Sequence, residues 1–501
     1  MLIKLNILSC VVLFSLFLYT SCDKRNEPSG DPDSPEDTTG VLTNLPLAKF
    51  TISNNQCVPV CEVAFTNNSL HSDTYSWDFG DGTVSSAEAN PSHYYTKTGT
   101  FQVILTASKS GRLEYDKDTQ IVEIVRPPYA IGTSKNEYGT GLVQTSDGGY
   151  VVVGRREING ASYNVYLFKT DSNRKIVWEK DFGGAGYQEA NAIRQTTDGG
   201  YVIVGNSTDA ESGFNDVYVI KTDSDGNSIW EKKISSPSKR SGQDILQTTD
   251  NGFIIAGTSN NPGNTGNSDA LLLLKIDFQG NLLWEKTLGS SASDGGFTIS
   301  EAADGNILVG GFYDFQLSGT KPYLIKMDPS GEVLWERYDA GYLLFATAVQ
   351  KTSDGGIIWG GMDSYSTGNW RGAVTKTDAN GVVEWTTRFP GTGTYFNSIE
   401  CIRPTSDGGY IMCGQSDESG MSYPVRRHIV VRKLDVQGNK LWEKQYFAGG
   451  RVGNAYDIQQ TPNGGYVLVG YMLIEPLSDP TPSFFDYDVY LLKLDPNGEL
   501  Q

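Results

Sequence analysis

Short apolar runs separated by tight turns recur along most of the chain. In one clear case, the turn Thr197–Gly200 is followed by the β-branched and aromatic run Tyr201–Val204, and a further apolar run ends at Lys221. Runs of this length, bounded by glycine and aspartate, are typical of buried β-strands. Glycine permits the positive φ of a tight hairpin, and an aspartate side chain can close the turn. The pattern predicts an all-β protein.

This strand-and-turn unit is written seven times. Its fullest turn is Thr-x-Asp-Gly-Gly-aromatic, with anchors 50 to 56 residues apart at Asp147, Asp198, Asp250, Asp304, Asp354, Asp407 and Asn463. A glycine follows each anchor by seven residues, at Gly154, Gly205, Gly257, Gly311, Gly361, Gly414 and Gly470. Repetition of short strands at this period is the signature of propeller blades. Residues 127–501 are therefore predicted to form a seven-bladed β-propeller.

The second half of each unit is equally regular. A lysine stands two residues before an aspartate in every copy, and six copies place a tryptophan seven residues after that aspartate, at Trp178, Trp230, Trp284, Trp335, Trp385 and Trp442. Large aromatic side chains dominate core burial, so these rings are expected to fill the gaps between neighbouring blades. The seventh copy has no such tryptophan. Segment 127–134 precedes the first turn where a tryptophan strand precedes the others, and we expect it to pair into the last blade and close the ring.

The N-terminal segment predicts export and lipidation. Residues 1–21 combine a basic start, an apolar run and small residues before Cys22, which is the composition of a signal peptide. The junction resembles a bacterial lipoprotein signal of the Bacteroidetes type, which implies lipidation of Cys22 and attachment to the outer membrane through the lipid anchor. The alternative is an ordinary cleaved signal. Residues 22–44 are rich in Asp, Pro, Ser and Thr and are predicted to form a flexible linker.

Charge and cysteine content fit that location. The chain carries 59 acidic and 40 basic residues, a net charge of −19, which argues against a nucleic-acid partner. Acidic residues after the lipidated cysteine resemble surface-export signals, so display at the cell surface is expected, with the periplasmic face as the alternative. In an exported protein disulfides are favoured. We expect one at Cys57 and Cys61 and one at Cys401 and Cys413, which a symmetric hairpin would place opposite each other; free buried thiols are the alternative.

Residues 45–126 are organised differently from the repeats. They contain Trp77-Asp-Phe-Gly-Asp-Gly82 and Asn90-Pro-Ser-His-Tyr-Tyr95, and they resemble a PKD domain over nearly their whole length. That resemblance implies an immunoglobulin-like β-sandwich acting as a spacer or weak adhesive module. His93 is expected to be a packed structural residue, and Asp78 and Asp81 are expected to hold turns rather than a metal ion.

The repeats themselves resemble, loosely, the quinoprotein (PQQ-type) propellers of exported bacterial proteins, in the blade tryptophan and the glycine-rich turns. No quinone site is recognisable, so no cofactor is expected, and no metal site is expected either. His428 is the only histidine of the propeller and follows two arginines, which is too little to indicate a Ser/His/Asp triad or a multi-histidine metal site. Paired carboxylates remain open as catalytic groups.

Length variation between copies falls on one face only, which we call the long-loop face. It carries the loops between second and third strands and the links between blades; the other, short-turn face carries minimal turns. Function tends to lie on variable loops of a rigid scaffold. The candidate ligand-binding residues there are aromatic: Tyr187, Tyr342, Tyr365, Trp370, Tyr395, Tyr423, Phe484 and Phe485.

Exposed aromatic rings with nearby polar groups suit sugar rings, although such rings can also pack within their own loops. Three functions are considered. The first is non-catalytic binding of a glycan or protein through the long-loop face. The second is a polysaccharide-degrading hydrolase or lyase, and the third is a structural scaffold of the cell envelope.

Overall fold

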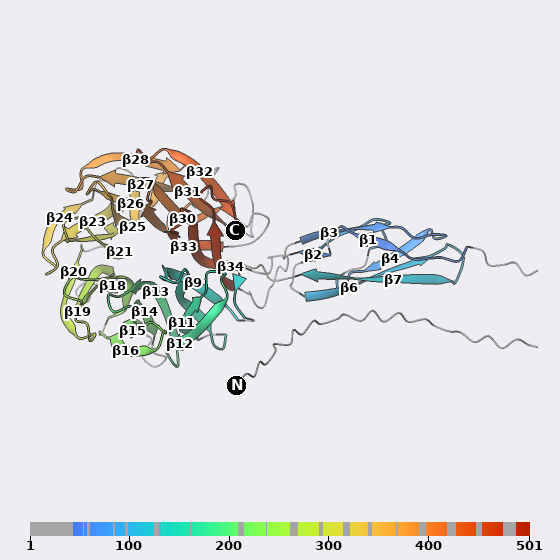
Figure 1. The fold of residues 1–501 in the computed structure, drawn as a ribbon, viewed down its shortest axis with the longest axis horizontal. Coiled ribbons are helices and arrows are strands. Elements are labelled where there is room, and N and C mark those ends of the chain that lie inside the picture. Colours follow the sequence, from blue (N-terminus) through green and yellow to red (C-terminus); the bar gives the residue numbers. More distant parts are fainter. Residues whose placement is uncertain are drawn as a thin grey trace, which may run out of the picture. The chain divides into compact units, whose positions relative to one another are not determined.

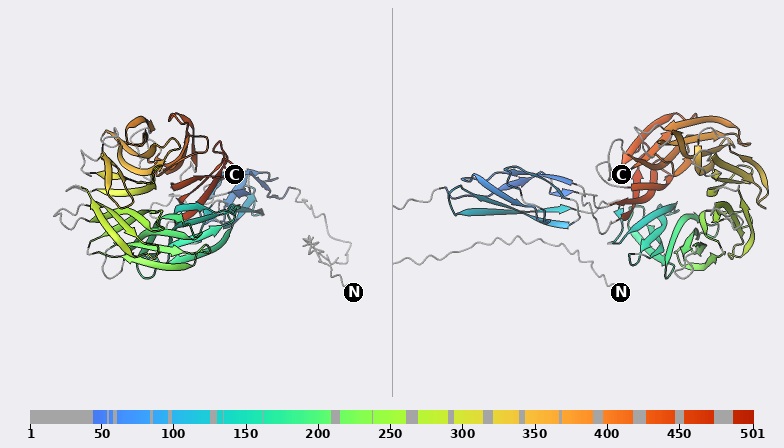
Figure 2. Two further views of the ribbon diagram at one scale, coloured as in Figure 1. Left: turned by 60° about the vertical axis from the view of Figure 1, so that its left-hand side comes forward. Right: turned by 180° about the vertical axis from the view of Figure 1, so that it is seen from behind.

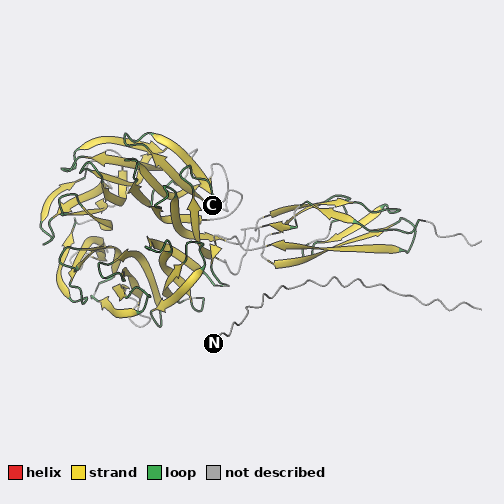
Figure 3. Ribbon diagram, in the orientation of Figure 1, coloured by secondary structure: helices red, strands yellow, loops and turns green. Residues whose placement is uncertain are grey.

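The fold was examined in a computed structural model. It describes residues 44–501 except for 54, 58–60, 84–85, 96–98, 125–129, 134, 161, 209–214, 237, 261–268, 290–293, 314–320, 339–342, 367–368, 390–396, 418–426, 447–452 and 474–486. Cys22 and most of the linker therefore lie outside the described residues, as do the side chains of Cys57 and Cys61, so these predictions stay predictions. Every regular element of the described residues is a strand (Figure 3).

The first domain is a β-sandwich, as predicted. One sheet has the order β1-β3-β5 and the other β2-β7-β6-β4. The strands are β1 (Phe50–Ile52), β2 (Gln56–Cys57), β3 (Cys61–Asn67), β4 (Thr74–Asp78), β5 (Ser92–Tyr95), β6 (Gly99–Ser108) and β7 (Tyr115–Ile124). Trp77 is fully buried between the sheets and packs edge-on against Phe50 with ring centroids 5.0 Å apart.

The PKD turn residues have structural partners. His93 stacks on Phe79 with ring centroids 4.2 Å apart, and its Nε2 lies 2.7 Å from Asp81 Oδ2. Asp78 accepts a hydrogen bond from the backbone of Gly80 at 2.9 Å, and Asp81 accepts one from the backbone of Thr83 at 3.1 Å. These contacts agree with the prediction that the histidine is packed and the aspartates hold turns.

Seven four-stranded blades form the second domain and are arranged in a ring (Figures 1 and 2), with blades 1 and 2 joined by one bridge between Tyr163 and Tyr187. Blade 1 consists of β9 (Glu137–Gln144), β10 (Tyr150–Glu157), β11 (Tyr163–Thr170) and β12 (Ile176–Phe182). Blade 2 consists of β13 (Tyr187–Gln195), β14 (Tyr201–Thr208), β15 (Asn215–Thr222) and β16 (Ser228–Ile234). Blade 3 consists of β17 (Arg240–Gln247), β18 (Phe253–Asn260), β19 (Asp269–Ile276) and β20 (Leu282–Leu288).

Blades 4 to 6 follow the same order of strands. Blade 4 consists of β21 (Gly295–Glu301), β22 (Ile307–Tyr313), β23 (Lys321–Met327) and β24 (Val333–Arg337). Blade 5 consists of β25 (Leu343–Lys351), β26 (Ile357–Ser366), β27 (Asn369–Thr377) and β28 (Val383–Phe389). Blade 6 consists of β29 (Cys401–Pro404), β30 (Tyr410–Asp417), β31 (Arg427–Leu434) and β32 (Lys440–Tyr446).

Blade 7 closes the ring with strands from both ends of the domain. It contains β33 (Gly453–Gln460), β34 (Tyr466–Leu473), β35 (Tyr487–Leu494) and, as its outer strand, β8 (Ala130–Ile131). The register pairs Ile131 with Val489 and Ala130 with Tyr490. The predicted closure by segment 127–134 is confirmed for the two residues of β8.

Tryptophans of the outer strands lie between blades, as predicted. Trp178 of blade 1 packs against the turn of blade 2 so closely that a Cβ on Gly226 would lie 2.6 Å from its ring. The same relation joins Trp230 to Gly280, Trp284 to Gly331, Trp335 to Gly381, Trp385 to Gly438 and Trp442 to Gly498. Each turn glycine has a positive φ of 76° to 88°. Glycine is therefore required twice over, by backbone conformation and by the neighbouring ring.

The repeated aspartate and lysine hold the two halves of each blade together. In blades 1 to 6 the lysine of the third strand pairs with the turn aspartate at 2.6 to 2.9 Å. In blade 1, Asp147 also accepts hydrogen bonds from Thr145 Oγ1 at 2.5 Å and from the Gly149 backbone at 3.1 Å. In blade 7 the anchor is Asn463, and Lys493 Nζ instead donates to the Ser172 carbonyl of blade 1 at 3.2 Å.

Candidate ligand-binding site

In six of the seven blades the innermost strand contains a β-bulge that turns one residue out of the ladder, and in blade 6 the equivalent residue, Glu400, directly precedes β29. In blade 2 the register jumps from Ala190 to Ala192, which leaves Asn191 without a partner residue in β14. A Cβ on Gly205, opposite this bulge, would collide with the Glu189 carbonyl, so the repeated glycine makes room for the bulge. The corresponding residues, each seven before the turn anchor, are Thr140, Asn191, Gln243, Phe297, Thr347, Glu400 and Tyr456.

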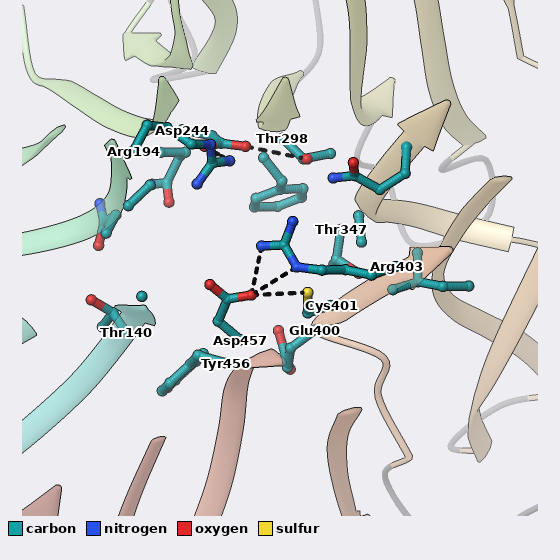
Figure 4. A pocket seen from close by; sticks show the side chains of 18 residues that line it. Thr140, Arg194, Asp244, Thr298, Thr347, Glu400, Cys401, Arg403, Tyr456 and Asp457 are labelled. Carbon is teal, nitrogen blue, oxygen red and sulfur yellow. Dashed lines mark hydrogen bonds and ion pairs between the residues drawn. The ribbon is translucent and has the colours of Figure 1, made fainter. Parts of the chain in front are cut away.

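These seven residues line a cavity of about 110 Å³ in the centre of the ring, which we call the channel pocket. Every blade contributes to it, and Figure 4 shows side chains from around the ring pointing toward one another. The residue after the bulge also lines the pocket in each blade, together with Arg194, Gln350, Ile402 and Arg403. The pocket thus collects two neighbouring positions per blade that differ in residue type from copy to copy.

Two arginine–aspartate pairs bridge adjacent blades across the wall of the pocket. Arg403 of blade 6 reaches Asp457 of blade 7 at 2.7 Å, and Arg194 of blade 2 reaches Asp244 of blade 3 at 2.6 Å. Asp457 is 8% exposed and Asp244 9% exposed as side chains. Buried charges need partners of opposite sign, and each pair supplies one, so the pocket wall is polar and locally balanced in charge.

Glu400 is a pocket residue whose pKa is shifted by its surroundings. Burial raises the pKa of its carboxyl group, against the effect of a 2.7 Å hydrogen bond from Ser398 Oγ. The residue keeps some accessible surface because it faces the cavity. Loss of water around a carboxylate disfavours its charged form, so the pocket holds an acid with a raised pKa near an ion-paired carboxylate.

Cys401 and Cys413 correct one prediction. They lie directly opposite each other in β29 and β30, as expected, but both are free buried thiols, so the predicted disulfide is wrong for this pair. The Cys401 thiol donates instead to Asp457 Oδ1 of the next blade, at 3.3 Å (Figure 4). Burial raises the pKa of Cys401 to about 12. Its sulfur is committed to the pocket wall rather than to the neighbouring strand.

A group of tyrosines extends from the pocket over blades 7, 1 and 2 at the long-loop face. We call Tyr138, Tyr163, Tyr187, Tyr471 and Tyr487 the tyrosine cluster. Its ring centroids are 5.0 to 6.3 Å apart, and all five residues are partly exposed. Tyr456, on the pocket wall, lies 5.9 Å from Tyr471. The cluster therefore continues the pocket outward.

An arginine sits among these rings. Arg155 lies 4.1 Å above the Tyr138 ring and pairs with Glu189 at 2.6 Å, and Glu189 also accepts a hydrogen bond from the Tyr187 hydroxyl at 2.9 Å. Burial raises the pKa of Tyr138 and Tyr187 above the usual range, so both remain phenols. The surface offers ring faces, hydroxyls and one balanced ion pair.

A smaller apolar group lies on blades 4 and 5. Phe297, Phe312 and Phe345 form a triangle with ring centroids 5.3 to 6.2 Å apart, and Phe297 also lines the channel pocket. Phe297 of blade 4 and Tyr456 of blade 7 are therefore the aromatic residues that line the channel pocket itself, and each leads to a larger group of rings.

Of the aromatic residues proposed from the sequence, only Tyr187 has a described side chain, and it belongs to the tyrosine cluster. Trp370 lies in β27, paired with Ser364 of β26, and Tyr365 lies in β26, but their side chains are outside the described residues. Tyr342, Tyr395, Tyr423, Phe484 and Phe485 lie wholly outside them. The sequence reasoning missed the channel pocket, although its signal was present as the variable position seven residues before each anchor.

Among the described residues, no group of three or more His, Cys, Asp or Glu side chains is arranged to hold a metal ion. Within the same ranges, no helix has the length and apolar character needed to span a membrane. His428 is buried in β31, paired in register with Ser416.

Fold and site together define the chain's class: a PKD-type β-sandwich followed by a seven-bladed β-propeller with a polar channel pocket. Residues 44–124 match the PKD domain family. A polysaccharide lyase of family PL25, an ulvan lyase bound to -[GlcA(1-4)Rha3S]-, is similar at 10% identity and a TM-score of 0.46, over 74% of this chain and 96% of that one.

Two further solved structures are similar to the propeller. The α-L-arabinanase of Penicillium chrysogenum, complexed with arabinobiose, shares 12% identity at a TM-score of 0.39 over 62% of this chain and 96% of that one. The Pan2 WD40 domain of Neurospora crassa shares 14% identity at a TM-score of 0.40 over 62% and 84%. At such identities the likeness concerns the fold alone.

Proposed function

We propose that the protein is a lipoprotein anchored in the bacterial outer membrane, displayed at the cell surface, that binds a glycan without cleaving it. The PKD domain would act as a spacer, and the propeller would bind the ligand at the long-loop end of its channel. The tyrosine cluster is the observation that carries this proposal. A protein ligand at the same surface is the alternative occupant.

Five partly exposed tyrosines beside an ion pair are suited to sugar recognition. Sugar rings present apolar C–H faces that stack on aromatic rings, while their hydroxyls both donate and accept hydrogen bonds. Tyr163 contributes a ring face, and Tyr187 and Glu189 contribute polar groups within hydrogen-bonding distance of each other. The cluster is held by strand ends rather than by loops, which fixes its rings before a ligand arrives.

Glycan-array binding tests the proposal. The wild-type protein is expected to bind a defined set of plant, host or microbial glycans, and Tyr163→Ala is expected to weaken binding about tenfold or more, a loss of 1.4 kcal/mol. Tyr115→Ala removes a ring that is 63% exposed on the PKD domain and serves as the matched control, with no expected change. A protein that binds no glycan on the array would contradict the proposal and favour a structural role in the envelope.

The anchor has its own test. Detergent phase partitioning of the full chain is expected to place the wild type in the detergent phase and Cys22→Ala in the aqueous phase, because acyl chains supply the membrane affinity. Protease treatment of intact cells then separates the two orientations. Degradation of the propeller is expected for surface display, and protection would assign the periplasmic face instead.

One observation favours a second candidate, a polysaccharide-degrading enzyme. Glu400 has a raised pKa and lies in the same pocket as Asp457, which is ion-paired to Arg403. Carboxyl groups held at different acidities can divide the roles of acid and base in glycan cleavage. Incubating the wild type and Glu400→Gln with a bound polysaccharide decides between them: new reducing ends or unsaturated products, lost in the variant, would establish the enzyme.

A further inference from the structure

We infer that the channel pocket binds one uncharged sugar residue at the end of a glycan chain, so that the protein recognises chain ends rather than chain interiors. This inference rests on the proposed glycan-binding function and assigns a role to a pocket distinct from the aromatic loops predicted from the sequence. The inference is based on the position of Tyr456, which lines the small polar pocket and also lies next to Tyr471 of the tyrosine cluster.

Size limits what the pocket can hold. A cavity of about 150 Å³ is enough for one benzene ring, and the channel pocket measures about 110 Å³. It can take the hydroxyl-bearing edge of a single sugar ring, but it has no room for several residues of a chain threaded through it. A glycan could therefore reach the pocket only by its end.

Chemistry of the wall points to an uncharged ligand. Arg403 with Asp457, and Arg194 with Asp244, place both signs of charge at the pocket in pairs. Because each pair is already balanced, a charged sugar would lose its hydration in the pocket without gaining an unpaired opposite charge there. A hydroxyl accepts from an arginine N–H and donates to a carboxylate oxygen. Adjacent hydroxyls of a neutral sugar can thus engage such a pair without disturbing its balance.

Two aromatic rings complete the pocket. Phe297 of blade 4 and Tyr456 of blade 7 both line it, and aromatic faces are the usual partners of the apolar face of a sugar. Beyond Tyr456, the ring of Tyr471 lies 5.9 Å away and leads to Tyr138 and Tyr487, at 5.0 and 5.5 Å from it. Residues of the chain next to the terminal sugar would lie over this cluster, outside the pocket.

Substitution at Gln243 tests the inference with a matched pair. Gln243 is the bulge residue of blade 3, lines the pocket, and makes one 2.6 Å hydrogen bond, to Ser241 Oγ. Gln243→Trp fills the cavity, whereas Gln243→Ala leaves the space open; neither touches an arginine–aspartate pair. Gln350→Trp fills the pocket from blade 5 and replaces the first variant if that one melts well below the wild type.

The probes are neutral oligosaccharides of two to six hexose or pentose units, with oligogalacturonides as charged counterparts, measured by titration calorimetry at pH 7. Gln243→Ala is expected to bind a neutral series more weakly than the wild type by the loss of the amide's hydrogen bonds, and Gln243→Trp at least tenfold more weakly than Gln243→Ala. A bulky aromatic tag on one end of the oligosaccharide is expected to abolish binding, and the same tag on the other end to leave it intact.

The outcomes separate this inference from the proposed function. If Gln243→Trp binds like the wild type while Tyr163→Ala loses binding, the glycan-binding function stands and the chain-end inference is wrong. Tight binding of oligogalacturonides, or equal binding of both tagged forms, also overturns the inference. If all proteins fail to bind every neutral and charged probe, the proposed function fails with it.

Discussion

Two positions of the repeat lie only seven residues apart but differ in how far their residue type is conserved between the seven copies. One is the turn anchor, and the other is the pocket residue seven positions before it, which we call the channel position. At the anchor, six of seven copies hold the same aspartate, and each pairs with a buried or half-buried lysine. At the channel position the copies hold Thr, Asn, Gln, Phe, Thr, Glu and Tyr. The anchor is fixed because it joins two hairpins of a blade. The bulge residue is not part of the turn that joins the hairpins, so its residue type can vary, and in Thr140, Asn191 and Thr347 its side chain donates to a backbone carbonyl of the next blade.

Ring closure is the part of the repeated scaffold whose loss is expected to have the largest effect. Deleting residues 127–134 removes β8, leaves β35 as an open edge and exposes the core around Ile131, which is 7% exposed. We expect the melting temperature to fall by roughly 10 °C or more, since each kcal/mol lost is worth about 2–4 °C in domains somewhat smaller than this one. Differential scanning calorimetry measures it.

A shorter truncation, of residues 1–44, is the control for that deletion. It removes the predicted signal and linker but keeps the closing strand, so its propeller is expected to melt with the full chain. A propeller without 127–134 that melts with the parent would show that closure by β8 does not stabilise the ring.

Junctions between blades come next. Trp230→Ala leaves a cavity beside Gly280, against which the ring packs closely. We expect the free energy of unfolding to fall by about 3 kcal/mol, which is the lower end of the range for a large aromatic residue, because Trp230 is only partly buried. Gln243→Ala in the channel is expected to change stability by less than about 0.5 kcal/mol. Chemical denaturation measures both. Similar losses from the two substitutions would erase the distinction between scaffold and channel.

The sequence predicted the constant positions of the repeat well and the channel position poorly. Anchors, glycines and tryptophans recur because each has one structural task, so the seven blades, the tryptophan packing and the closing segment could be predicted from spacing alone. The channel pocket depends on register: only the observed bulge shows that the position seven before each anchor points inward. The geometry of Cys401 and Cys413 was foreseen, but the competing hydrogen bond to Asp457 comes from another blade, which no local pattern reveals.

Acid is expected to weaken the turn anchors, because hydrogen bonds and ion pairs lower the pKa of their aspartates in the folded protein. Burial alone would raise the pKa of Asp354, but hydrogen bonds from Thr352 and Lys376 outweigh it and lower the pKa from 3.8 to about 2. Asp250 and Asp407 are likewise lowered to about 2. Their folded pKa lies below the unfolded one, so their stabilisation is present above about pH 4 and is lost as the pH falls from 4 toward 2.

Denaturation with urea at pH 6, 4, 3 and 2 measures this loss. Because these aspartates are more than half exposed, each contribution is reduced by solvent, and the effect is smaller than that of Trp230→Ala. Asp354→Asn is expected to be less stable than the wild type at pH 6 and to approach it at pH 2. A constant difference across this range would mean that the charge of Asp354 does not matter.

The smallest expected effect lies at the one junction that breaks the repeat. Where six turns have a glycine packed under a tryptophan, blade 1 has Arg174 with φ of 69°. The blade before blade 1 in the ring is blade 7, whose outer strand β8 carries no tryptophan. The turn of blade 1 therefore has room for the Arg174 side chain, and the only destabilising effect there is the strain of the positive φ. Arg174→Gly removes that strain and is expected to change stability by between zero and about 1 kcal/mol in the stabilising direction, since glycine also gains entropy when unfolded.

Gly226→Ala is the counterpart at an ordinary junction. It adds a Cβ 2.6 Å from the Trp178 ring at a φ of 76° and is expected to destabilise by more than about 1 kcal/mol. Urea denaturation of both variants compares the two junctions directly. If Arg174→Gly destabilised as much as Gly226→Ala, the turn glycines would not owe their place to the neighbouring tryptophan, and the difference between the closing junction and the other six would need another cause.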